Sequence, residues 1–451
     1  MSRLLCGTAK QCITPPPELL PRLVGLKQYR FAGVLDDLYV RALALGDEEG
    51  RALLLSFDMT MAPCTQEFLE RTARETGVPE ERILFFSIHT HAVPFNNIDL
   101  ERREEQDEDT LAACREYTAF LHGRALQAAK EAAASMVPAR MGWAWGESFI
   151  NVVRLQEYTY LDEAGLTFPV CNLGADPSRP ADRALFTLRV EDLEGKALAF
   201  LVNYAMHNVA TIWNDYDGSG AMGVSGDVGG RVSRLLEEEH PGSVALWSSG
   251  AAGDLNPMML NEIYLPDPRT GRTYSQPVKG LNTALYCLQI MSERHYADVK
   301  RTLRTVKCAQ EDGKTTGAVE WSVTPGVDCV RHHNAPPEFL TGPEVPEHTV
   351  RLQMVRVGGL TLLGAGAEVY SSIGAELRAA APGDTVLITH NASTLCRSHY
   401  LLDDETIARC DASRGCAMVP GYDEYRCLPG ISRDLTAHVR SMASAIERRT
   451  Q

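Results

Sequence analysis

Apolar runs that alternate with helical segments are the feature that most limits what this chain can fold into. Residues 51–62, "RALLLSFDMTMA", form a near-continuous apolar run, and the segment after them has helical spacing and ends at a glycine. Residues 82–91, "RILFFSIHTH", begin a second such run. Strands this apolar are typical of a sheet that is covered on both faces, so the sequence predicts an α/β fold.

The rest of the chain continues this alternation. A long helix rich in alanine and leucine is expected over residues 111–135, and more strands and helices follow it. We find no internal repeat or clear linker, so we expect one large domain, residues 1–451, with mixed β-sheets covered by helices. Residues 311–346 are rich in proline and glycine, and we expect them to leave this pattern as an irregular excursion.

Composition excludes several classes of protein. The 451 residues carry a formal net charge of -15, which opposes binding to the phosphate backbone of nucleic acids. No run approaches the roughly 20 apolar residues of a membrane-spanning helix, and no N-terminal segment resembles a signal peptide. We therefore expect a cytoplasmic protein with no nucleic-acid or membrane partner, whose 12 cysteines are mostly buried thiols.

The second apolar run ends in two histidines, His89 and His91. Side chains two residues apart in a strand lie on the same face, so both histidines are expected to point the same way. Ligands bind at strand ends in open α/β sheets, and neutral imidazole is a common ligand of zinc. The alternative is that both are polar residues that simply find hydrogen-bond partners there.

His207 and Glu368 are further candidates for a metal site at strand ends. His207 ends the apolar run "ALAFLVNYAMHN", and Glu368 follows the run "LTLLGAGA". Glu368 would supply the carboxylate that a zinc site with two histidines needs as its third ligand. The alternatives are that His207 is an ordinary buried histidine and that Glu368 complements the dipole of the helix it opens.

Two glycine-rich loops each bring a Gly-Asp pair to the boundary of an element. Asp227 lies in "GVSGDVGG", where it either supports the site or caps the helix expected to begin near Gly230. Asp254 and Asn256 lie in "GAAGDLNP", whose glycines permit close approach of the backbone to a ligand. Asp58, in the first apolar run, is expected to orient a metal-bound histidine.

The order of these segments resembles the neutral/alkaline non-lysosomal ceramidase family. The matching segments are, in chain order, "GTAKQCITPP", "GVLDDLYVRALAL", "LLLSFDM", "RILFFSIHTHAVP", "NYAMHN", "VSGD", "GAAGDLNP" and "GAEVYSSIG". They span nearly the whole chain, and the most specific pieces are the His-Thr-His segment and the strand that ends in His207. The resemblance implies a large α/β catalytic domain that holds one zinc ion.

The resemblance also implies which residues bind the metal. Carried over to this chain, the family's zinc ligands imply His89, His207 and Glu368. The fourth family ligand is a tyrosine, but the family's paired-tyrosine spacing is absent here. The candidates for the fourth position, besides water, are Tyr400, His390 and His399.

The remaining site residues are expected to act on the substrate. By resemblance, His91 would transfer protons, and Arg154, Asp254 and Asn256 would hold polar groups of the substrate. The family's ceramidases carry a serine at the position of Asn256, and a C-terminal β-domain that we expect this chain to lack. Long-chain ceramide is therefore not the expected substrate.

The sequence thus predicts a zinc-dependent hydrolase with one ion per chain, amidase-like by resemblance. Metal-activated water would attack a small, soluble metabolite that bears an amide or many hydroxyl groups. One alternative is a metal-dependent enzyme of sugars or polyols, either a glycoside hydrolase or a lyase. The other is a protein that binds a metal or ligand without catalysis.

Overall fold

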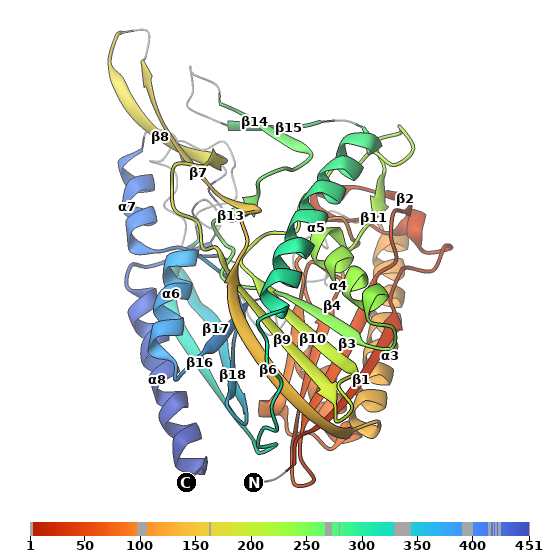
Figure 1. The fold of residues 1–451 in the computed structure, drawn as a ribbon. Coiled ribbons are helices and arrows are strands. Elements are labelled where there is room, and N and C mark those ends of the chain that lie inside the picture. Colours follow the sequence, from red (N-terminus) through yellow and green to blue (C-terminus); the bar gives the residue numbers. More distant parts are fainter. Residues whose placement is uncertain are drawn as a thin grey trace.

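Two stacked β-sheets with helices on both outer faces make up the architecture (Figure 1). The computed structural model describes residues 3–96, 106–161, 164–266, 273–278, 280–328, 344–389, 400–413, 416–417, 419, 422 and 425–450. The expected α/β class with mixed sheets covered by helices is confirmed.

The larger sheet has eight strands. Their order is β12 (Val244–Ser249), β10 (Ala197–Tyr204), β9 (Ala184–Asp192), β6 (Val137–Glu147), β1 (Leu5–Cys12), β3 (Tyr39–Gly46), β4 (Arg51–Phe57) and β5 (Ile83–Ser87). Parallel pairs lie at both edges, β10 with β12 and β4 with β5, and antiparallel pairs connect them. The two apolar runs that predicted strands are β4 and β5.

Helices cover one face of this sheet, and they are α1 (Gln66–Thr76), α3 (Glu108–Ala134), α4 (Asp227–Glu239) and α5 (Leu281–Leu303). Strand residues alternate between the two faces: Ala42 and Ala44 of β3 pack towards α1 and α3, whereas Leu43 and Leu45 pack towards the second sheet. Helix α1 ends at Gly77 in the left-handed conformation, which confirms the predicted glycine stop.

The smaller sheet stacks on the other face of the larger one. Its strands, in order, are β20 (Thr385–Thr389), β18 (Leu360–Ala365), β17 (Glu344–Val357), β16 (Thr315–Asp328) and β23 (Tyr425–Cys427). Leu362 and Val386 pack against the larger sheet, and the outer face is covered by α6 (Ser371–Ala380) and α8 (Ile431–Thr450). Within the segment expected to be irregular, 311–346, residues 315–328 form the long strand β16 and residues 344–346 begin β17, while residues 329–343 lie outside the described residues.

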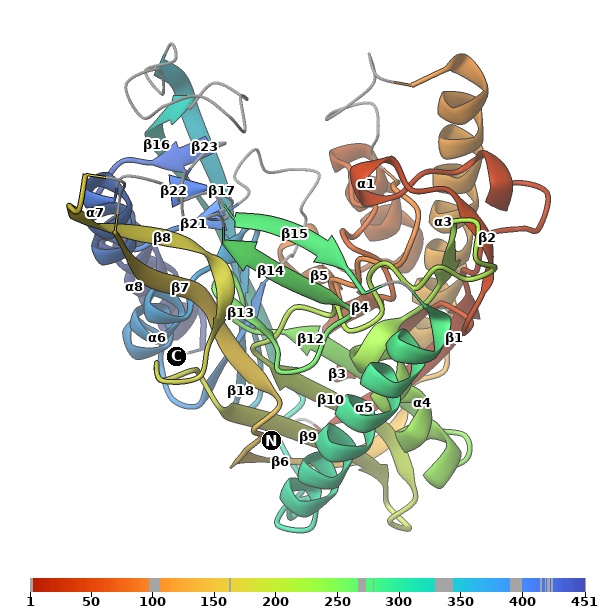
Figure 2. The ribbon, with the colours of Figure 1, turned by 90° about the horizontal axis from the view of Figure 1, so that it is seen from above.

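Shorter elements gather at one end of the sandwich, where β5, β10 and β18 end (Figure 2). The strands are β2 (Phe31–Val34), β7 (Asn151–Leu161), β8 (Thr167–Asp176), β11 (Met222–Val224), β13 (Leu255–Pro257), β14 (Glu262–Pro266), β15 (Thr273–Pro277), β19 (Glu368–Val369), β21 (Tyr400–Leu401) and β22 (Cys416–Ala417). The helices there are α7 (Asp404–Ala412) and the 3₁₀ turns Leu20–Arg22 and Leu26–Gln28, whereas a third 3₁₀ turn, Glu80–Arg82, directly precedes β5. Among the described helices, none is both long and apolar enough to cross a membrane.

A buried polar chain joins α5 to the larger sheet. Trp247 of β12 donates its indole N–H to His295 Nε2 at 3.3 Å, so the proton of this neutral imidazole is on Nδ1. Nδ1 lies 3.0 Å from Ser148 Oγ, which in turn donates to Asp298 at 2.8 Å. Burial lowers the pKa of His295 to about 4. The imidazole is therefore neutral in the folded protein above that pH.

His295 should make the protein less stable in acid. Because its pKa of about 4 in the folded state lies below the ordinary 6.5, the unfolded chain binds an extra proton as the pH falls between these values. The free energy of unfolding should fall by up to about 3 kcal/mol over this range from His295 alone. Urea unfolding at pH 7, 5.5 and 4.5 measures it, and His295→Gln should show a smaller loss. Equal losses in both proteins would contradict this role of His295.

Candidate metal centre

The two histidines of the His-Thr-His segment lie just beyond β5, which ends at Ser87. His89 has a left-handed backbone, with φ of 61°. The two imidazoles nevertheless face each other, with 3.1 Å between His91 Nε2 and His89 Nε2. The expectation that both point the same way is confirmed, although a turn produces it rather than the alternation of a strand.

His207 and Glu368 reach the same point from the two different sheets. His207 follows β10, and its Nε2 lies 3.0 Å from Glu368 Oε2. The same carboxylate oxygen lies 3.3 Å from His89 Nε2. Glu368 is in β19, before α6 begins at Ser371, so it does not sit in the first turn of that helix.

Backbone carbonyls determine which nitrogen of each imidazole faces the cluster. His89 Nδ1 is 2.9 Å from the Thr60 carbonyl oxygen, and His207 Nδ1 is 2.7 Å from that of Ala252. A carbonyl only accepts, so each ring carries a proton on Nδ1 and turns its Nε2 towards Glu368. Ala252 belongs to the second glycine-rich loop, which therefore serves to hold His207.

Burial sets the protonation states of the cluster. His207 is fully buried, which lowers its pKa to about 3, and the charge of Arg154 acts in the same direction. Burial likewise holds the pKa of His91 well below 6.5. Burial raises the pKa of Glu368, but the nearby imidazoles more than offset this and hold it well below its ordinary range. Neutral imidazoles and an ionised carboxylate are the forms that bind metal ions.

The geometry of these groups fits a metal ion. Ligand atoms of His89, His91 and His207 all lie within 4.8 Å of one another. Around a tetrahedral zinc ion with bonds of about 2.0–2.1 Å, ligand atoms lie roughly 3.3 Å apart. The distances of 3.0 and 3.3 Å from Glu368 to the two Nε2 atoms are close to this value.

Tyr400 completes the cluster from β21, the partner strand of β19. Its hydroxyl lies 3.3 Å from His207 Nε2, so among the three protein candidates for the fourth position Tyr400 reaches the cluster. His390 and His399 lie outside the described residues. The Arg154 guanidinium carbon is 5.3 Å from the centre of the Tyr400 ring.

Arg154 and Asp254 both form hydrogen bonds with neighbouring groups of the protein. Arg154 donates from Nε and Nη2 to the Gly253 carbonyl, at 3.0 and 2.6 Å. The Asp254 carboxylate accepts two bonds of 2.7 Å from the backbone N–H and the hydroxyl of Ser371. Asp254 therefore caps α6 from another loop, and its expected role of holding a polar group of the substrate stays a prediction.

Asn256 contacts Arg154 and also lines a cavity. Its Oδ1 is 3.5 Å from Arg154 Nη1, and it lines an open cavity of about 430 Å³. The other lining residues are Gln156, Gly174, Ala175, Met258, Met259, Leu260, Glu262 and Cys287. A cavity of this size falls within the range of small-molecule sites.

Asp58 does not contact the imidazoles, contrary to prediction. Both its oxygens lie 2.8 Å from Arg41 Nη1, in a buried ion pair, and Oδ2 also accepts from the Tyr39 N–H at 2.9 Å. The role expected of Asp58 towards His89 belongs instead to the Thr60 carbonyl. From the sequence alone, a carboxylate in an apolar run can equally orient a metal ligand or pair with a buried arginine.

Asp227 supports the site indirectly. It is the first residue of α4, and its carboxylate accepts from the N–H groups of Ala210 at 3.2 Å and Thr211 at 2.7 Å. These residues form the turn that follows His207. Asp227 thus holds that turn against the helix, and its supporting role towards a metal site stays a prediction.

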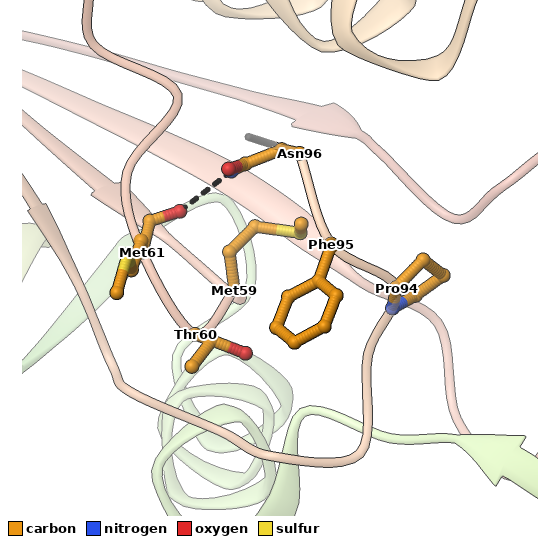
Figure 3. Close-up of a pocket in the computed structure, with 6 residues that line it drawn as sticks. All are labelled: Met59, Thr60, Met61, Pro94, Phe95 and Asn96. Atoms are coloured by element: carbon orange, nitrogen blue, oxygen red, sulfur yellow. Dashed lines mark hydrogen bonds between the residues drawn. The ribbon is translucent and has the colours of Figure 1, made fainter. Parts of the chain in front are cut away.

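Thr60 is a site residue that the sequence did not reveal. Besides accepting from His89, it donates its hydroxyl to the Thr90 carbonyl at 2.7 Å. Behind it lies a cavity of about 10 Å³, too small for a substrate, lined by Met59, Thr60, Met61, Pro94, Phe95 and Asn96 (Figure 3). Asn96 donates to the Met61 carbonyl at 2.7 Å and so fixes the segment that carries Thr60 (Figure 3).

Comparison with known proteins identifies the fold. No protein-family model and no curated protein sequence matches the chain. Among solved structures, the neutral ceramidase from Pseudomonas aeruginosa matches 100% of this chain and 75% of its own, with a TM-score of 0.71 and 16% identity. The fold is that of a neutral ceramidase. A ceramidase complexed with C2 matches equally well, over 100% of this chain and 76% of its own.

The ceramidase fold confirms the architecture implied by the order of motifs. The matches extend along the entire chain, as the quoted segments do. At this identity they establish the fold, and the chemistry has to be argued from the side chains of this chain.

Proposed function

We propose that the protein is a zinc-dependent hydrolase of a small, soluble metabolite. The observation that carries the proposal is the convergence of His89 Nε2, His207 Nε2 and Glu368 Oε2, with 3.0 and 3.3 Å from the carboxylate to the two nitrogens. Two histidines and a glutamate form a ligand set typical of catalytic zinc. In this proposal Tyr400 or water takes the fourth position.

His91 is the proton-transfer group in this proposal. A zinc ion bound here would lower the pKa of a coordinated water to about 7 and polarise the scissile carbonyl. His91 Nε2 lies 3.1 Å from His89 Nε2, at the edge of the ligand set. From there it can take a proton from the attacking water and return it to the leaving group.

Arg154, Asn256 and Tyr400 form the side of the site towards the cavity. The Arg154 donors are used largely on Gly253, so its proposed role is to position Asn256 and Tyr400 beside the metal. The Asn256 amide offers donors and an acceptor to a polar group of the substrate. Asp254 contributes by fixing the start of α6, three residues after Glu368.

The lining of the cavity favours an amide-bearing substrate with an apolar part. Met258, Met259 and Leu260 lie beside Asn256 in the cavity, and the methionines are 47% and 37% exposed. Methionine adapts to irregular apolar groups. A sugar or polyol, the second candidate, would satisfy Asn256 and Gln156 but leave these apolar side chains without a partner. Amide hydrolysis is therefore the function we propose.

Substrate specificity tests this proposal. We expect little or no turnover of a long-chain ceramide in detergent by the zinc-loaded protein, because Asn256 cannot act as the hydroxyl group that a serine offers. Soluble amides with a short apolar arm should be hydrolysed faster than glycosides. Asn256→Ser is the matched variant for the ceramide assay. A wild-type kcat/KM on ceramide near the ordinary enzyme range, about 10⁴ M⁻¹s⁻¹ or above, would contradict the proposed specificity.

A further inference from the structure

The backbone turn at His89 needs support from its surroundings. Its φ of 61° places a non-glycine residue in the left-handed region, a strained conformation that persists only where neighbouring groups enforce it. This turn aims the His89 imidazole at Glu368. Whatever holds the turn therefore also sets the position of one member of the cluster.

Asn208 contacts the chain on both sides of His89. Its side-chain amide donates to the Ile88 carbonyl. Its backbone carbonyl accepts from the His91 N–H at 3.2 Å. Thr90 and Asn208 also form an isolated parallel bridge. Asn208 is fully buried and is the residue after His207. The residue next to one imidazole thus brackets the turn that carries the other.

The other end of the Asn208 amide is fixed to a helix. Its Oδ1 accepts from the Gly229 N–H at 2.9 Å, in the first turn of α4. Asp227, at the start of the same helix, binds Ala210 and Thr211 just beyond Asn208. Helix α4 therefore holds the segment of His207 at three places, and through Asn208 it also holds the segment of His89.

We infer that Asn208 is a positioning residue that sets the separation of His89 and His207 and hence the affinity of the site for zinc. The inference rests on the proposed metal site and adds to it a residue that touches neither metal nor substrate. One amide side chain connects both histidine segments to the same helix. Without it, the His89 turn would relax towards an ordinary backbone conformation, and the imidazole would turn away from the cluster.

The test compares two buried asparagines. Asn208→Ala removes the bonds to Ile88 and Gly229. Asn214→Ala is the matched control, because Asn214 is also fully buried and bonds Thr211 and Gly223, yet none of its bonds reaches the His89 turn. Zinc affinity is measured by chelator competition, the absorption spectrum of bound Co²⁺ reports ligand geometry, and urea unfolding of the metal-free proteins reports stability.

We expect Asn208→Ala to bind zinc 10–100-fold more weakly, the usual effect of removing a group that orients a ligand, and to change the Co²⁺ spectrum. Asn214→Ala should lose stability but keep wild-type affinity and spectrum. Asn208→Asp keeps an acceptor for Gly229 but loses the donor to Ile88. It should behave like Asn208→Ala, and it replaces that variant if the alanine form does not fold.

Two results would overturn the inference while leaving the metal site in place. One is wild-type zinc affinity in the Asn208 variants, and the other is an equal loss of affinity in Asn214→Ala, which would mean general loosening of the fold. A wild-type protein that binds no zinc would reject the proposed function as well. The failure of the inference and the failure of the proposed function therefore give different results.

Discussion

His207→Ala should leave the protein without bound metal and without activity. His207 Nε2 is a proposed ligand, and the Ala252 carbonyl holds its ring in place. An alanine at position 207 has no side-chain atom that could bind the metal instead. Elemental analysis after dialysis should fall from one zinc per chain to almost none, and turnover should fall with it. His122→Ala is the control, because His122 is a partly buried histidine whose Nε2 bonds the Pro63 carbonyl away from the cluster.

Full metal content in His207→Ala would remove His207 from the site. Loss of metal in both variants would point to a general defect in folding, which urea unfolding would detect. The distinction matters because His207 is fully buried, and its replacement also leaves a space in the interior.

His91→Ala should keep its zinc and lose about 10²–10⁴-fold in turnover, the usual contribution of a general acid–base group. The His91 imidazole contacts His89. The ion pairs of Glu368 are with His89 and His207 and not with His91. Metal content and kcat measured on the same preparation separate the two roles. If His91→Ala loses its metal, all three clustered histidines act as ligands and the proton passes through another group.

The candidate metal ligands could be predicted from the sequence because each ends a strong apolar run. Strands of that kind are buried, and polar side chains at their ends are few enough to be recognised. His89 and His207 follow β5 and β10 of the larger sheet, Glu368 lies in β19 just beyond β18 of the smaller sheet, and the structure brings them within hydrogen-bonding distance. The order of motifs also indicated the fold, which the solved ceramidases share.

The roles of the aspartates could not be predicted, because the partner of a buried carboxylate is set by tertiary contacts. Asp58 pairs with Arg41 across two neighbouring strands, and Asp254 bonds Ser371 from a loop 117 positions away. The groups that orient the imidazoles are backbone carbonyls of Thr60 and Ala252, which any residue type would provide. The residue types at positions 60 and 252 therefore could not indicate that these carbonyls orient the imidazoles.

The smaller sheet was also hard to predict in part. Proline and glycine within residues 311–346 indicated irregular structure, yet β16 pairs with β17 along most of its length. The pairing shifts register between Thr324 and Gly326, beside Pro325, so the strand accommodates the proline at an irregularity. Valine, tryptophan and threonine within β16 favour a strand by themselves, so proline and glycine alone did not decide the structure of this segment.

Anomalous X-ray scattering at the zinc edge, from crystals of the protein loaded with zinc, tests the central claim most directly. The account predicts a single peak per chain, bonded at about 2.0–2.2 Å to His89 Nε2, His207 Nε2 and one oxygen of Glu368. A peak elsewhere in the molecule, or no peak at this cluster at full zinc loading, would contradict it.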